Sequence, residues 1–285
     1  MKIGSAAHKE LFCRSLMNSY LDYEPERLPW PELDAAESQR LQSIPFWEEA
    51  LNTELKAGNT IQAYLPSVTD PLIREAIALQ GEEESRHGRL FKHLTDRYNV
   101  QLSGQPPNRT VELGESGFVE FGYGECLDAF LGFGLFKIAR QSKFLPDALM
   151  DIFDILLQEE ARHIVFFVNW IAYLQVERGR GMRPLRAATS LWNYGKAAKN
   201  MMSLVNSSAE SNRSDFAATE AAVFMDDFSI QRLISECLSE NARRMAKFEP
   251  ELLQPELMPS LAKIALSTLQ LLPKSNAPQS ENLAS

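Results

Sequence analysis

Apolar residues recur along most of this chain every three or four positions, which is the spacing of one buried face of an α-helix. No segment keeps the alternation of apolar and polar residues that marks a half-buried β-strand. The pattern therefore predicts an all-α protein. The predicted helices cover residues 8–22, 34–43, 45–65, 71–99, 117–141, 146–176, 185–205, 215–247 and 255–272.

Prolines and capping residues support several of these boundaries. Asp70 is a favoured N-cap residue and Pro71 a favoured first helical residue, so a helix is expected to begin there. Pro146 opens another helix in the same way. Between the first two predicted helices, residues 24–31 contain three prolines, and this segment is expected to be extended.

Two pairs of neighbouring helices, within 45–99 and 117–176, look like an internal duplication. In each pair, a short break that ends near a proline precedes a helix with Glu-Glu-x-Arg-His about four turns in. The motif glutamates Glu84 and Glu160 lie 76 residues apart. This repetition predicts a four-helix bundle that is built from two hairpins.

Each motif places a glutamate three residues before a histidine, Glu84 before His87 and Glu160 before His163. On a helix this spacing brings both side chains to the same side. Both pairs interrupt apolar stripes, and a buried carboxylate is costly unless it is paired or bound to a metal. The stripe residues are Ile73, Ile77, Phe91 and Leu94 for the first pair and Leu149, Phe153, Phe167 and Trp170 for the second. The pairs indicate a metal site, and the alternative is a set of buried Glu–His hydrogen bonds that only fix helix packing.

Two such motifs on separate helices of a bundle resemble the ferritin-like di-iron carboxylate superfamily, in particular its oxygenase-type members. The resemblance covers about residues 45–176. It implies a ferritin-like four-helix bundle with additional N- and C-terminal helices. It also implies that Glu84, His87, Glu160 and His163 are metal ligands, and that each of the other two bundle helices adds one carboxylate.

On the first helix of the bundle, the candidates for this carboxylate are Glu54 and Glu49. Glu54 lies on the apolar stripe of the helix, whereas Glu49 points away from that stripe. The internal repeat favours Glu49, which precedes Glu84 by 35 residues, and Glu125 precedes Glu160 by the same interval. Because a ligand must point inward, we expect Glu54 to be the ligand and keep Glu49 as its alternate.

On the third helix, the candidates are Glu125 and Asp128, which stand three residues apart on one side. Glutamate is the usual ligand in the family that the sequence resembles, whereas Asp128 is closer in level to Glu160. We therefore expect Glu125 to be the ligand, with Asp128 as its alternate. Arg86 and Arg162 have no acceptor atom and cannot bind a cation, so they are expected to point outward as salt-bridge partners.

Four carboxylates and two imidazoles suit two iron ions, with manganese as the alternative metal. In the family that the sequence resembles, a reduced metal pair binds and reduces O2, so O2 is the expected co-substrate. The expected function is an O2-activating oxygenase or oxidase of a small apolar or aromatic organic substrate, supplied by an electron donor protein. The alternatives are a ferroxidase or iron-storage protein and a metal-binding redox protein without catalysis.

Composition narrows the cellular setting. The net charge of −9 and the pI near 5.1 argue against nucleic acid or an anionic membrane as a partner. Three widely spaced cysteines suggest a reducing compartment. The longest apolar run, 164–174, is too short to span a bilayer, and no secretion signal is visible. We expect a cytoplasmic monomer or homodimer.

The expected organisation has four parts. They are a lead-in at 1–44, the bundle at 45–176, C-terminal helices that pack on the bundle at 177–274, and a disordered tail at 275–285. Within the third bundle helix, Gly132 and Gly134 are costly for helix stability. Either a close helix crossing or room for a ligand would account for them.

Overall fold

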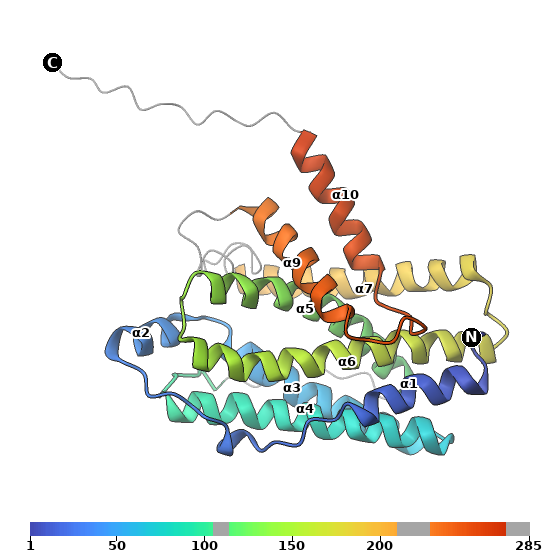
Figure 1. Ribbon diagram of the computed structural model, residues 1–285, viewed down its shortest axis with the longest axis horizontal. Coiled ribbons are helices and arrows are strands. Elements are labelled where there is room, and N and C mark those ends of the chain that lie inside the picture. Colours follow the sequence, from blue (N-terminus) through green and yellow to red (C-terminus); the bar gives the residue numbers. More distant parts are fainter. Residues whose placement is uncertain (105–113, 210–228, 272–285) are drawn as a thin grey trace.

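The computed structural model describes residues 1–104, 114–209 and 229–271, and in these ranges the chain is helical with turns and no β-strand (Figure 1). The prediction of an all-α protein is confirmed. The α-helices are α1 (Ala6–Asn18), α2 (Ala35–Ser43), α3 (Trp47–Tyr64), α4 (Pro71–Arg97), α5 (Gly114–Gln141), α6 (Asp147–Glu177), α7 (Arg183–Ala209), α9 (Ile230–Met245) and α10 (Leu257–Leu271). None of the helices in the described ranges is both long and apolar enough to cross a membrane.

Four long helices form the centre of the molecule. Helix α3 packs along α4 and α5 packs along α6, and the two pairs meet where α3 contacts α5 and α4 contacts α6. The apolar stripes of these helices are buried against one another, as their three- and four-residue spacing requires. Polar side chains that interrupt the stripes are therefore carried into the interior.

Two layers of aromatic rings fill this interior at different heights. In one layer, the Trp47 ring lies 5.7 Å from Phe153 and 6.1 Å from Phe91, measured between ring centroids. In the other, Phe118 lies 4.9 Å from both Tyr64 and Trp170. Along α4 and α6, the motif histidines lie between these layers, because His87 precedes Phe91 by one turn and His163 precedes Trp170 by two.

Of the remaining helices, α7, α9 and α10 lie on the side of α5 (Figure 1). Helix α1 packs on the outer side of α4 and α6, which are the second helices of the two hairpins. Helices α7 and α9 pack against α5, and α10 leans on α9 and projects away from the rest.

The predicted start of α4 agrees with its cap, whereas α6 begins at Asp147, with Pro146 as its N-cap and no side-chain cap hydrogen bond. The Asp70 side chain accepts hydrogen bonds from the backbone N–H groups of Leu72 and Ile73 at 3.0 and 3.2 Å, and α4 begins at Pro71. Only the last part of the helix predicted at 215–247 can be compared, because 210–228 lie outside the described residues; this part is α9. The tail predicted at 275–285 also lies outside them.

The two glycines of α5 have different surroundings. A Cβ atom on Gly134 would lie 2.8 Å from the backbone nitrogen of Cys237 and 2.9 Å from its Cα, so only glycine lets α9 approach this closely. A Cβ on Gly132 would meet no atom within 4 Å. Close helix crossing therefore accounts for Gly134 and not for Gly132.

Candidate metal centre

Side chains from three helices meet in the interior at the height of the Glu-x-x-His motifs. Glu54 from α3, Glu84 and His87 from α4, and Glu160 from α6 each offer one ligand atom, and all of these atoms lie within 4.8 Å of one another. His87 Nδ1 lies 2.9 Å from Glu160, 3.5 Å from Glu54 and 3.6 Å from Glu84, measured to the nearest carboxylate oxygen. A group of this size and composition can enclose a metal ion.

His163 lies on the other side of the same two carboxylates. Its Nδ1 is 3.0 Å from Glu84 Oε1 and 3.7 Å from Glu160 Oε2. The other oxygen of each of these carboxylates faces His87. The imidazole centroids are 5.7 Å apart. Glu84 and Glu160 thus lie between the two histidines, which is the placement that a pair of bridging carboxylates requires.

Glu125 joins this group from α5. Its partly buried side chain contacts Glu160, and burial together with the negative charges of Glu160, Glu84 and Glu54 raises the pKa of Glu125 well above the ordinary value of 4.5. Glu54 shows the same effect, since burial raises its pKa to about 8. Four carboxylates are therefore concentrated in a region where their charges repel unless protons or cations compensate them.

The alternative ligands differ in their surroundings. Glu54 and Glu125 lie with the motif residues, whereas Glu49 is exposed. Asp128 is exposed as a residue, but burial of its carboxyl group and the charges of Glu49 and Glu160 raise its pKa to about 7. The apolar stripe of α3 therefore predicted correctly that Glu54 points inward and Glu49 does not. That these residues bind metal remains a prediction.

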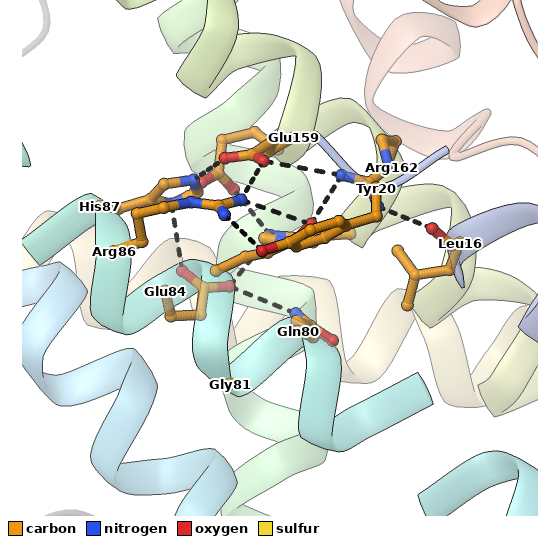
Figure 2. A network of polar contacts seen from close by, with 12 residues as sticks. Leu16, Tyr20, Gln80, Gly81, Glu84, Arg86, His87, Glu159 and Arg162 are labelled. Carbon is orange, nitrogen blue, oxygen red and sulfur yellow. Dashed lines mark hydrogen bonds and ion pairs between the residues drawn. The ribbon is translucent and has the colours of Figure 1, made fainter. Parts of the chain in front are cut away.

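A second layer of charged residues contacts the outer side of the histidines, and each motif pairs with residues of the other; Figure 2 labels Glu159 together with His87 and Arg86. His87 Nε2 lies 2.8 Å from Glu159 Oε2, and Arg86 Nη2 donates to Glu159 Oε1 at 2.5 Å. In the mirrored arrangement, His163 Nε2 lies 2.7 Å from Glu83 Oε2 and Arg162 Nη1 donates to Glu83 Oε1 at 2.8 Å. Each motif thus uses its first glutamate to hold the histidine and the arginine of the other.

Arg86 and Arg162 are salt-bridge partners, as predicted, of Glu159 and Glu83. The prediction that they point outward to solvent is wrong. They are only 4% and 2% exposed, because α1 and the segment that follows it cover this side of α4 and α6. Arg162 Nη2 donates to the Leu16 carbonyl at 2.7 Å. Helical periodicity gave their direction relative to the bundle but gave no information on what lies outside it.

Sequence reasoning also missed the roles of Glu83 and Glu159. A signal was present, because both motifs begin with two glutamates and the first stands three and four residues before the arginine and the histidine. Both glutamates are fully buried. A buried carboxylate needs a partner of opposite charge, so the repetition of Glu-Glu pointed to a second role for the first member.

The acidic surroundings control the protonation of both histidines. Burial alone would lower the pKa of His87, but the hydrogen bond of its ring to Glu159 and the nearby carboxylates of Glu160, Glu54 and Glu84 raise it well above 6.5. The same opposition of burial and carboxylates raises the pKa of His163. Without a cation, protons on the two imidazoles compensate the carboxylates, so a bound metal ion would replace those protons.

The atoms that face inward lack hydrogen-bond partners. They are His87 Nδ1, His163 Nδ1, Glu84 Oε2, Glu160 Oε1 and Glu160 Oε2. Some lie close together, but none is aligned for a hydrogen bond, although unpaired buried polar atoms are costly. The outward Nε2 atoms of both histidines do have carboxylate partners. Imidazole nitrogens and carboxylate oxygens presented in this way fit iron or manganese, whereas hydrogen bonding for packing alone would not leave them unpaired.

Comparisons of the chain with protein-family models, with curated proteins and with solved structures find no match. The residues and their arrangement therefore carry the functional proposal.

Proposed function

We propose that this chain is a ferritin-like dinuclear carboxylate protein that binds two iron ions, with manganese as the alternative metal. We further propose that it uses them with O2 to oxidise a small apolar or aromatic organic molecule. The main support is the contrast between the two faces of the histidines. Their outer nitrogens are held by carboxylates, and their inner nitrogens have no hydrogen bond and face further carboxylates.

Each ion would take one histidine and one terminal carboxylate. His87 and Glu54 would hold one ion, because their side chains are neighbours. His163 and Glu125 would hold the other, since both side chains lie close to Glu160. Glu84 and Glu160 would bridge the ions, since each has one oxygen toward each histidine.

Charge balance agrees with two divalent cations. The four proposed carboxylate ligands carry four negative charges, which two divalent ions neutralise. Behind them, Glu83 and Glu159 are balanced by Arg162 and Arg86. The buried cluster would then have no net charge, which keeps the cost of burying so many ionised groups low.

When bound, a reduced pair of these ions supplies electrons to O2. Glu83 and Glu159 accept hydrogen bonds from the Nε2–H groups of the histidines. This fixes the tautomer and leaves Nδ1 as the ligand atom. The aromatic layers that contain Phe153 and Phe118 exclude water on both sides of the cluster and favour an apolar substrate. A chemical or protein electron donor must restore the reduced state after each turnover.

Metal stoichiometry tests this proposal. The protein, loaded anaerobically with Fe(II) and desalted, is expected to retain two equivalents per chain, and Glu84→Ala and His163→Ala are expected to lose at least one. Glu82→Ala is the matched control, because Glu82 lies on the same helix but is exposed. Retention of two equivalents in Glu84→Ala and His163→Ala would show that the metal binds elsewhere.

Oxygen consumption and size separate the proposed activity from its alternatives. The reduced, iron-loaded protein is expected to consume O2 faster in the presence of a small aromatic substrate. Uptake of O2 that no organic compound stimulates, together with a very large hollow assembly in size-exclusion chromatography, would favour iron storage.

A further inference from the structure

The segment that follows α1 covers the outer layer of the metal centre. Tyr20 and Tyr23 place their rings against the Arg86 guanidinium, whose central carbon lies 5.0 and 4.2 Å from the two ring centroids. Arg86 Nη1 also donates to the Tyr20 hydroxyl at 2.9 Å. Nearby, Arg162 Nε donates to Ser19 Oγ at 2.9 Å. This segment lies outside the duplicated helices, so its contacts with the two motifs need not be the same.

Among the described residues, one of the two supporting glutamates accepts a hydrogen bond from a tyrosine. The Tyr23 hydroxyl donates to Glu159 Oε2 at 2.8 Å, and the same oxygen accepts the Nε2–H of His87. At the corresponding position, Glu83 Oε2 accepts the Nε2–H of His163 at 2.7 Å, with no tyrosine hydroxyl on it among the described contacts. The remaining contacts match, since one arginine donates to the other oxygen of each glutamate.

We propose that Tyr23 is a positioning residue that makes the two metal positions inequivalent, because it fixes Glu159 and, through Glu159, the imidazole of His87. This inference rests on the proposed function, since it concerns how the same cluster binds its two ions. A carboxylate that accepts from His87, Arg86 and Tyr23 together cannot rotate without breaking a charge-assisted hydrogen bond. In the described part of the chain, Glu83 accepts from His163 and Arg162 but from no tyrosine.

The Tyr23 hydroxyl is suited to this role because it keeps its proton. Burial is the main reason that the pKa of Tyr23 lies well above 10.0, and the charge of Glu159 contributes in the same direction. The hydroxyl is therefore a donor to Glu159 throughout the physiological pH range. Its ring lies between solvent and the Arg86–Glu159 pair, so it also keeps water from that pair.

The test removes one hydroxyl and leaves the ring. Metal-free wild type, Tyr23→Phe and Tyr20→Phe are each titrated with Co2+, followed by visible absorption and by calorimetry. In Tyr23→Phe, one of the two equivalents is expected to bind about 10-fold more weakly, as is typical when a partner behind a ligating histidine is lost. The other equivalent is expected to keep its affinity, because Glu83 and His163 keep their contacts. Tyr20→Phe is the matched control: it removes a hydroxyl from Arg86 but none from Glu159, so both affinities should remain.

The outcomes separate three cases. If wild type binds no Co2+, the proposed function is overturned and the inference with it. Suppose that wild type binds two equivalents. If Tyr23→Phe then binds both with wild-type affinity, or loses affinity equally at both positions, the inference alone is overturned, since a hydroxyl with only a structural role would not weaken one position selectively. The same holds if Tyr20→Phe reproduces the loss. Thermal unfolding of the metal-free variants shows whether each remains folded.

Discussion

His8 is a buried titratable residue that lies outside the metal centre and joins α1 to α6. It is fully buried, and its Nε2 lies 3.0 Å from Asn169 Oδ1. The Gly4 N–H donates to its Nδ1 at 3.2 Å, so Nδ1 is an acceptor and Nε2 carries the proton. His8 is therefore neutral in the folded protein, and burial is the main reason that its pKa lies below 6.5.

Acid is therefore expected to weaken folding through His8. The unfolded chain takes up this proton near pH 6.5, whereas the folded chain takes it up only at lower pH. Because the unfolded state binds more protons in this window, the free energy of unfolding falls as the pH drops below 6.5, and the loss ends below the folded pKa. Urea unfolding of wild type and His8→Leu from about pH 8 to about pH 5 measures the effect. Parallel pH profiles for the two proteins would contradict it.

At the scale of single residues, the direction of a side chain could be predicted where one helix decides it. The stripe of α3 placed Glu54 inward and Glu49 outward, and the structure agrees. Prediction failed for Arg86 and Arg162, because α1 covers the face on which they lie. Which distant element covers a helix depends on contacts between residues far apart in sequence, and periodicity carries no information on these.

At the scale of helices, the distance between α5 and α9 depends on one glycine. Gly134→Ala would gain up to about 1 kcal/mol of helix propensity. The added Cβ, however, would press on the Cys237 backbone, which cannot move aside as a side chain can. Overpacking of this kind costs about 1–3 kcal/mol, so Gly134→Ala is expected to lower the free energy of unfolding overall.

Gly132→Ala is the matched control on the same helix. Its Cβ would meet no atom within 4 Å, so only the propensity gain remains and the variant is expected to be more stable than wild type. Urea unfolding of both variants gives the comparison. Similar stabilisation of both would mean that α9 does not approach α5 as closely as the structure indicates.

Helices themselves could be predicted well from the sequence, because their signals are local. The predicted helix at 45–65 corresponds to α3 and the one at 146–176 to α6, each within two residues at either end. Prolines lie next to three of these four ends, with Pro45 and Pro66 flanking α3 and Pro146 preceding α6. The packing of α7 and α9 on α5 could not be predicted, since α5 is apolar nearly all round and its own pattern prefers no side.

For the whole molecule, the N-terminal segment is part of the site and not only a lead-in. Leu16, Ser19, Tyr20 and Tyr23 contact the second layer of charged residues, which in turn contacts the two histidines. We therefore expect residues 16–23 to help hold the second layer of charged residues in place. The proposed metal centre is therefore a property of the complete fold and not of the duplicated helices alone.

Metal binding is accordingly expected to stabilise the entire molecule. A ligand that binds only the folded state adds about 2.7 kcal/mol when its free concentration is 100 times its Kd. Here the effect has a structural reason, since cations would satisfy the five inward atoms that lack partners and compensate four crowded carboxylates. Thermal unfolding with and without Mn2+ should therefore show a rise in Tm that a chelator reverses. The Glu84→Ala, His163→Ala double variant is expected to show no rise, and an equal rise in this variant would mean that Mn2+ acts at the acidic surface instead of the buried cluster.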